Sequence, residues 1–124
     1  MATQLSAEAH EKLSTQKVIW FSSVRPDGRP HLVPIWFVWL AEKLYVGTGP
    51  KSVKARNIRR NPQVVLALED GIHPIICEGQ AAILAQPLPA DLLQAFLQKY
   101  EWDLTQEDQY GLVIEVTPQK WMAW

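Results

Sequence analysis

The pattern of hydrophobic and polar residues divides the chain into short strands separated by turns. Residues 17–25 are rich in β-branched and aromatic side chains and residues 30–40 are almost entirely apolar, which predicts a strand in each segment. Pro26-Asp27-Gly28-Arg29 between them has the composition of a tight turn, so the two strands form a hairpin. With a third strand at residues 44–48, we expect an antiparallel meander.

The second half of the chain repeats this alternation. We predict strands at residues 63–69, 74–84 and 111–117, and a seventh short strand in the C-terminal segment 119–124. Gly79 predicts a bulge or a sharp bend within its strand. Because the strands follow one another without βαβ units, a mostly β or α+β barrel is favoured over a Rossmann sheet.

Three short helices are expected beside these strands, at residues 5–15, 51–60 and 89–100. Ser6 is placed to cap the first helix, and Pro50 to open the second. The third helix has an apolar stripe made of Leu92, Leu93, Phe96 and Leu97.

Composition is that of an ordinary single-domain protein over residues 1–124. Of these residues 48% are hydrophobic and 20% charged, which excludes a disordered chain. The formal net charge of −1 argues against a dedicated nucleic-acid-binding protein. The N-terminus lacks an apolar signal segment and no run of 18 apolar residues occurs, so we expect a cytoplasmic protein without a membrane span.

Tryptophan is unusually frequent, with six residues in 124. Because side chains alternate along a strand, Trp36 and Trp39 point to opposite faces, and one of the two should lie outside the barrel core. Trp102 is expected to pack against the protein. For every tryptophan, core or dimer packing is the first interpretation, and a wall for a planar ligand is the second.

Positive charge gathers in the second helix. Five basic residues occur within ten positions without an acid, namely Lys51, Lys54, Arg56, Arg59 and Arg60. A solvated helix face is one interpretation. Phosphate binding is favoured slightly over a solvated face. Cations in the first turn are repelled by the positive end of the helix dipole, and a bound anion would offset this repulsion. Lys51, Ser52 and Lys54 lie within reach of one anion, and Thr48 can add a hydroxyl.

The sequence gives only weak evidence for any of the common catalytic arrangements of side chains. Cys77 lies in an apolar strand and is expected to be a small core residue, and a single cysteine excludes a disulfide framework. His10, His31 and His73 lack the spacing of a metal site, so we expect none. No catalytic residue is assigned, and if the protein is an enzyme, a cofactor supplies the chemistry.

The ordered segments PDGRPHLVPIWF, YVGTGPKSVKARNIRRNPQVVLALED and CEGQAAI resemble a known family. They are similar to the flavin-binding split-barrel proteins related to pyridoxamine 5′-phosphate oxidase, in the branch of small flavin- or deazaflavin-dependent oxidoreductases. The resemblance runs from about residue 10 to the C-terminus. It implies a six- to seven-stranded antiparallel split β-barrel, and a homodimer with two cofactor sites at the subunit interface.

The resemblance also implies site residues. The family's Ser-x-Lys followed by Asn-Pro matches Ser52, Lys54, Asn61 and Pro62, and in relatives such positions hold the cofactor phosphate. The segment 33–36 corresponds to the backbone that lines the isoalloxazine ring. Trp121 and Trp124 would reach the partner's site. The full expected cofactor-binding set is Val33, Pro34, Ile35, Trp36, Thr48, Gly49, Lys51, Ser52, Lys54 and Asn57.

The implied function is hydride transfer between the cofactor ring and a small organic substrate. The chain lacks the C-terminal extension of true pyridoxamine phosphate oxidases, so that activity is not expected. The compact cluster at residues 51–54 suits FMN, whereas Arg56, Arg59 and Arg60 could line a groove for the anionic tail of a deazaflavin, coenzyme F420; both cofactors stay open. A non-catalytic flavin- or haem-binding protein is the alternative, and a structural dimeric barrel the third interpretation.

Overall fold

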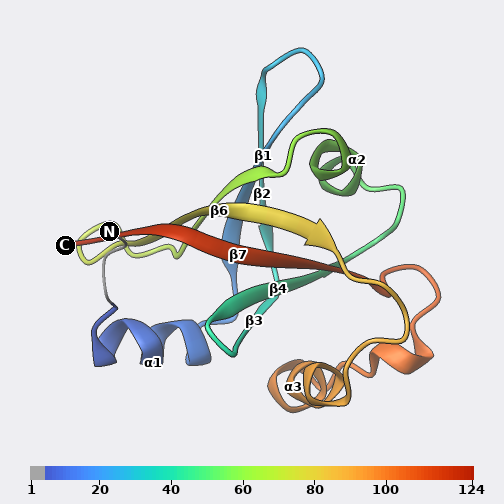
Figure 1. Ribbon diagram of the computed structural model, residues 1–124. Helices are drawn as coiled ribbons and strands as arrows, with labels where there is room; N and C mark the ends of the chain where they lie inside the picture. The colour runs from blue at the N-terminus through green and yellow to red at the C-terminus, as the bar shows by residue number, and fades with distance from the viewer. Residues whose placement is uncertain (1–4) are drawn as a thin grey trace.

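The computed structural model describes residues 5–124, so the first four residues of the expected domain lie outside the described residues. It is built around one antiparallel sheet of seven strands that curls into a half-barrel (Figure 1). The strands are β1 (Ile19–Val24), β2 (Pro30–Ile35), β3 (Phe37–Leu40), β4 (Lys43–Thr48), β5 (Gln63–Ala67), β6 (Ile75–Ile83) and β7 (Leu112–Ala123). The helices are α1 (Ala7–Thr15), α2 (Val53–Arg60), α3 (Ala90–Tyr100) and the short 3₁₀ helix η1 (Leu104–Gln106). The predicted mostly β architecture with flanking helices is confirmed.

The strand order explains the curl of the sheet. The order is β2-β1-β5-β6-β7-β4-β3, and every neighbouring pair is antiparallel. β2 and β3 are therefore the two edges of the sheet, yet only Trp36 separates them in sequence. Because one residue spans a few ångströms at most, the sheet must curl until its two edges meet at Trp36.

This arrangement corrects the predicted strand at residues 30–40 and the predicted meander. The apolar segment is two strands, of which β2 pairs with β1 and β3 pairs with β4 on the other side of the half-barrel. Trp36 at the corner belongs to neither ladder and is 48% exposed, whereas Trp39 packs against the core. The expectation that one of these two tryptophans lies outside the core is confirmed.

The corner is held by Tyr100, the last residue of α3. Its hydroxyl oxygen accepts a hydrogen bond from the Phe37 backbone N–H at 2.9 Å. The same hydroxyl lies 2.8 Å from the carbonyl oxygens of Phe37 and Lys17, which share its single hydrogen as acceptors. One phenol thus bonds backbone groups of Phe37, just after the break between β2 and β3, and of Lys17, just before β1.

The predicted C-terminal pair of strands is also wrong, because residues 112–123 form the single strand β7. The irregularity lies in its partner β6 instead, where the pairing register shifts between Glu78 and Gly79, as the bulge prediction required. A Cβ atom at Gly79 would lie 2.6 Å from the Thr117 carbonyl oxygen, so only glycine allows this close approach. The bulge lets β7 stay continuous.

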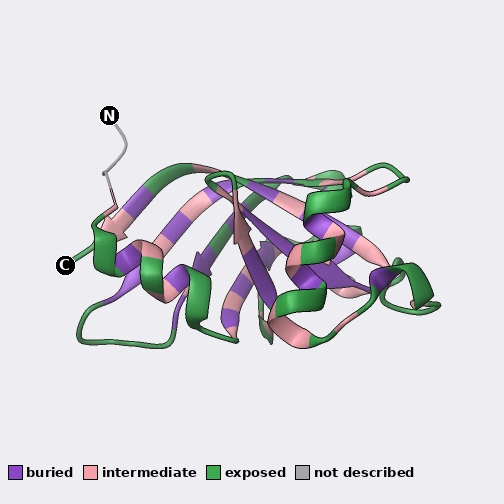
Figure 2. Ribbon diagram, turned by 90° about the horizontal axis from the view of Figure 1, so that it is seen from below, coloured by how far each residue is buried: buried purple, intermediate pink, exposed green. Residues whose placement is uncertain are grey.

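Two buried clusters fill the molecule. The larger one lies inside the half-barrel against α1, where Ser6 caps the helix as predicted and Leu13 is fully buried. The smaller one lies under α3, where Leu92 and Phe96 are buried but Leu97 is 42% exposed, which corrects the predicted stripe. In Figure 2 the buried residues follow the strands and the inward helix faces. No helix within residues 5–124 is long and apolar enough to cross a membrane.

The two C-terminal tryptophans, Trp121 and Trp124, differ in their burial. Trp121 is buried in the larger cluster, with its ring 5.6 Å from the Trp39 ring in an edge-to-face arrangement. It therefore cannot project into a partner's site, contrary to the expectation. Trp124 is exposed beyond the end of β7.

Removal of the Tyr100 hydroxyl tests the role of the corner. We predict that Tyr100→Phe lowers the free energy of unfolding by about 1–3 kcal/mol, because the buried Phe37 N–H loses its acceptor. Urea denaturation measures this change. Tyr110→Phe is the control, since the exposed Tyr110 makes no side-chain hydrogen bond within residues 5–124. Equal stability of the two variants would contradict the role given to Tyr100.

Candidate functional site

Most of the predicted site residues line two adjoining clefts. The first, which we call the lysine cleft, has a volume of about 530 Å³; its lining residues include Ile35, Thr48, Gly49, Lys51, Ser52 and Lys54. The second, the aromatic cleft, has a volume of about 390 Å³; its lining residues include Pro34, Ile35, Trp36, Trp102 and Tyr110. Ile35, Gly47 and Tyr110 line both clefts, so the two form one elongated depression.

The lysine cleft lies at the start of α2. Ser52 is the N-cap of this helix, and its Oγ accepts a hydrogen bond from the Ala55 N–H at 3.2 Å. The helix therefore begins at Val53, and the prediction that Pro50 opens it is wrong: a serine side chain that accepts from the first turn fixes the boundary instead. The Thr48 hydroxyl donates to Ser52 Oγ at 3.1 Å, which leaves the Ser52 hydroxyl hydrogen available to a ligand.

The two lysines of this cleft have different environments. Lys54 is half-buried in the first turn of α2, and burial lowers the pKa of its ammonium group. Lys51 lies exposed at the rim. Neither lysine forms an ion pair within residues 5–124, although Asp108 also lines the cleft. An anion bound here would stabilise the Lys54 charge and the free N–H groups of the helix together.

The aromatic cleft has a rigid wall. Trp36 stacks on Tyr100 with ring centroids 4.6 Å apart and planes 5° apart, and it meets the edge of Trp102 at 5.8 Å. The Trp102 ring crosses β4 at Gly47, where a Cβ atom would lie only 2.6 Å from it. The Trp102 indole N–H donates to Glu107 Oε1 at 3.2 Å. The expectation that Trp102 packs is confirmed, and it packs as part of a site wall.

Sequence reasoning missed the loop that closes both clefts. Residues 107–110 are not part of the predicted site, but Tyr110 lines both clefts and Asp108 and Gln109 line the lysine cleft. A Cβ atom at Gly49 would lie 3.1 Å from the Gln109 carbonyl oxygen, so this loop packs directly on the predicted segment. No local pattern reveals a contact between residues sixty positions apart.

Two members of the predicted set lie elsewhere. Val33 stands opposite Phe21 in the β1–β2 ladder and lines neither cleft. Asn57 is buried on another face of α2, where its Nδ2 donates to Ser23 Oγ at 3.0 Å. This hydrogen bond attaches α2 to β1 and so positions the helix that presents Lys54.

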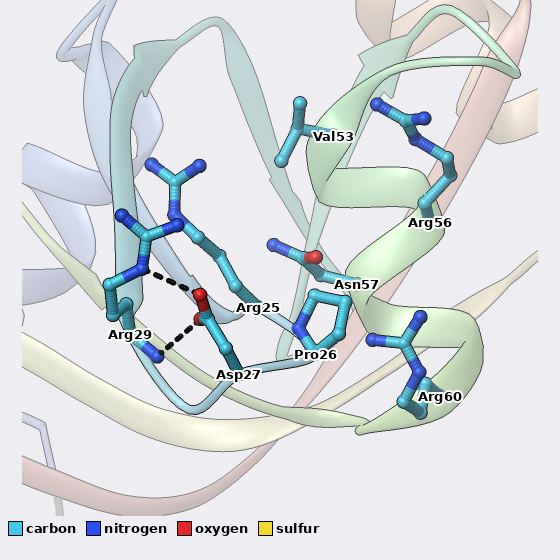
Figure 3. Close-up of a pocket in the computed structure, with 8 residues that line it drawn as sticks. All are labelled: Arg25, Pro26, Asp27, Arg29, Val53, Arg56, Asn57 and Arg60. Atoms are coloured by element: carbon cyan, nitrogen blue, oxygen red, sulfur yellow. Dashed lines mark hydrogen bonds and ion pairs between the residues drawn. The ribbon is translucent and has the colours of Figure 1, made fainter.

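Asn57 also lines a third cleft, which we call the arginine cleft. Its volume is about 380 Å³, and it lies between the β1–β2 turn and α2 (Figure 3). Its lining residues are Arg25, Pro26, Asp27, Arg29, Val53, Arg56, Asn57 and Arg60. The contribution of the turn was not predicted, although two arginines that flank a tight turn are visible in the sequence.

The pKa of His31, on β2, depends on charges from both the lysine cleft and the arginine cleft. Its Nδ1 atom is buried without a hydrogen-bond partner within residues 5–124. Burial lowers the pKa of its imidazole, and the positive charges of Arg25 and Lys54 lower it further. His31 therefore lies within the electrostatic range of one residue from each cleft. Within residues 5–124 no cluster of three His, Cys, Asp or Glu side chains forms that could hold a metal ion.

The comparisons with known proteins agree with the fold. Residues 5–124 match the family model described as pyridoxamine 5′-phosphate oxidase. No curated protein matches the sequence. Among solved structures, an F420 reductase is 26% identical with a TM-score of 0.76, covering 95% of this chain and 98% of that chain.

Two further structures show the fold alone. A conserved hypothetical protein from Mycobacterium tuberculosis is 22% identical with a TM-score of 0.79, covering 99% of this chain and 86% of that chain. The haem storage protein HutZ from Vibrio cholerae is 19% identical with a TM-score of 0.81, and the match covers 98% of this chain and 95% of that chain. The same half-barrel therefore occurs in proteins with different ligands.

The environment of His31 predicts a pH effect. Because its pKa in the folded protein lies below the ordinary 6.5, the unfolded chain binds this proton first as the pH falls. The contribution of neutral His31 to the free energy of unfolding is therefore complete above pH 6.5. It is lost as the pH falls from 6.5 through the pKa of His31 in the folded protein. NMR titration of the His31 ring, assigned with His31→Gln, measures that pKa. Inorganic phosphate bound beside Lys54 should raise it, and a pKa above 6.5 without phosphate would contradict this environment.

Proposed function

The chain belongs to the pyridoxamine 5′-phosphate oxidase family, and we propose that it is an oxidoreductase that uses FMN or a deazaflavin cofactor. The observation that supports this most directly is the arrangement of polar and aromatic side chains along the single depression that the two clefts form. Phosphate-binding groups lie at one end, in the lysine cleft, and a rigid aromatic wall lies at the other. A phosphorylated ligand with a planar ring needs those two ends.

The lysine cleft fits the phosphate. Lys54 supplies a half-buried positive charge without a carboxylate partner in residues 5–124, and Ser52 and Thr48 supply hydroxyls beside the helix N-terminus. Lys51 at the rim adds a second charge. Donors that are already fixed by the fold bind an anion without reorganisation, so this end positions the whole ligand.

The aromatic cleft fits the ring. Pro34 and Ile35 lie on β2, an edge strand of the sheet that pairs only with β1. Pro34 has no N–H to donate, which favours a position where strand pairing gives way to ligand contact. Trp36 and Tyr110 add apolar surface that excludes water from the ring.

A flavin or deazaflavin ring, when bound, exchanges hydride with a small organic substrate. The residues of this chain orient that ring and keep it dry: Trp36 and Trp102 fix one wall, and Tyr110 covers the junction of the two clefts. Glu107, engaged with the Trp102 indole, holds the wall in place. We assign no acid or base to the reaction, because the ring itself performs the transfer.

We also propose that the protein is a homodimer with the cofactor at the subunit interface. Leu32 and Val65 are exposed, and both stand opposite Ser22 in neighbouring ladders, so they share the outer face of the sheet. Trp36 is exposed at the same edge. An apolar face beside the aromatic cleft is typical of an interface that completes a site. Sedimentation equilibrium of the loaded protein measures its mass and tests this proposal.

Lys54 provides the test of the phosphate end. We predict that Lys54→Ala weakens FMN or deazaflavin binding by roughly 1.5–3 kcal/mol, about 10- to 150-fold, because a charged hydrogen bond to the phosphate is lost. Fluorescence titration measures the affinity. Lys120→Ala, on the exposed part of β7, removes the same charge away from the clefts and should leave affinity unchanged. Unaltered binding by Lys54→Ala would remove the phosphate from the lysine cleft.

A further inference from the structure

A groove lies between α1 and α3, in a part of the molecule that the proposed cofactor site does not use. Both helices contact the edge strand β3, and Figure 1 shows them on either side of it. The groove has a volume of about 460 Å³ and shares no lining residue with the lysine, aromatic or arginine clefts. We call it the helix groove; its lining residues include Thr15, Lys17, Val38, Trp39, Ala95 and Lys99.

The ammonium group of Lys99 is buried beside this groove without a hydrogen-bond acceptor. Its Nζ atom has no hydrogen-bond partner within residues 5–124, and it lies 3.8 Å from the centroid of the fully buried Phe37 ring. Burial, with a smaller contribution from the charge of Lys17, lowers the pKa of Lys99 from 10.5 to about 8. The group therefore stays mostly protonated at neutral pH, and the ring face stabilises the charge without replacing an acceptor. A buried cation of this kind costs free energy that a bound anion would offset.

The other residues that line the helix groove supply no negative charge for Lys99. Lys17 lines the same groove, and its ammonium group donates to the Lys99 carbonyl oxygen near the end of α3. None of the lining residues is acidic, and neither lysine forms an ion pair within residues 5–124. The α3 carbonyl thus offsets only the charge of Lys17, and the groove keeps an excess of positive charge.

The open edge of β3 adds a backbone donor. Phe37 turns its N–H and carbonyl groups to the Tyr100 hydroxyl and therefore away from β4. Because hydrogen-bonded positions alternate along an antiparallel strand, Trp39 also turns its backbone N–H away from β4, to the side where the groove opens. No side chain or neighbouring backbone carbonyl within residues 5–124 accepts this N–H. It is therefore free to donate to a ligand in the groove.

Apolar surface lies beside these donors. Val38 and Trp39 line the groove from β3, and Ala95 lines it from α3. The hydroxyl hydrogens of Ser14 and Thr15 are already donated to α1 carbonyls, so these residues add no further donor. At ~30 Å³ per water molecule, 460 Å³ corresponds to about fifteen waters, more than an inorganic anion occupies. The groove therefore has room for an anion that carries an apolar body.

We propose that the helix groove binds a small organic carboxylate, with the carboxylate group at Lys99 and the Trp39 backbone N–H and the apolar body on the apolar lining. Lysine carries three donors on a flexible stem, so the ammonium group can stay over the Phe37 ring while it donates to this acceptor. The site goes beyond the proposed function and does not depend on it.

An extended peptide is a less suitable ligand. A peptide that adds a strand to a sheet edge needs a row of free backbone groups. β3 is only four residues long, and Tyr100 already occupies the outward groups of Phe37. Trp39 is left as the single outward position of the strand, which suits one carboxylate group better than a chain of peptide groups.

Three probes and three variants test this site at neutral pH. The probes are phenylacetate, its neutral analogue phenylacetamide, and acetate, which lacks the apolar body. Lys99→Met removes the ammonium group and keeps an unbranched apolar stem, whereas Lys120→Met removes the same charge on the exposed part of β7. Ala95→Leu fills the groove without changing any charge. Dissociation constants come from NMR titration of the backbone and indole N–H signals of the full chain.

We expect phenylacetate to bind at least about tenfold more tightly than phenylacetamide or acetate, with the largest shifts at Trp39 and Lys99. Lys99→Met and Ala95→Leu should each weaken phenylacetate binding about tenfold or more. Lys120→Met should keep the affinity within about twofold, because an exposed charge away from the groove contributes little.

Equal affinities for phenylacetate and phenylacetamide would overturn the proposal, as would no measurable binding of phenylacetate or unchanged affinity in Lys99→Met. Shifts that gather around Ser52 and Lys54 would also overturn it, because they would place the probe in the lysine cleft. If Lys99→Met does not fold, unchanged affinity in Ala95→Leu is the contradicting result. None of these outcomes depends on FMN or deazaflavin binding, so this site and the proposed function succeed or fail separately.

Discussion

The structure depends on one constraint, the single-residue link at Trp36 between the two edge strands of the sheet. Because β2 and β3 end the sheet on opposite sides, the link requires the sheet to curl until those edges meet. The Tyr100 hydroxyl then satisfies the backbone of Phe37 at the corner. The curl also brings β2 beside the end of β4, which places Ile35 next to Gly47 in both clefts. The site therefore follows from closure of the half-barrel.

The second feature that shapes the site is a local concentration of positive charge around α2. A formal net charge of −1 describes the whole chain, but the region around α2 concentrates cations from two elements. Asn57 attaches this helix to β1 through Ser23, so the positive groups are held in place before any ligand arrives. A formal net charge of −1 over the whole chain is thus compatible with a prepared site for one small anion.

Local patterns predicted much of the fold and part of the site. The cap at Ser6, the bulge at Gly79 and the basic first turn of α2 each depend on neighbouring residues, and the structure has all three. The prediction failed where distant contacts decide the outcome. Residues 30–40 are uniformly apolar, so nothing local marks the corner at Trp36. The contributions of the 107–110 loop and of Arg25 to the clefts likewise exist only after folding.

We propose that the depression at the start of α2 binds a flavin-type cofactor. The most direct test is the absorption spectrum of the purified protein after incubation with FMN or F420 and removal of unbound ligand. We predict a bound chromophore, with a band near about 450 nm for FMN or about 420 nm for the deazaflavin. A protein that retains neither cofactor, or that shows only the Soret band of haem, does not bind a flavin-type cofactor in this depression.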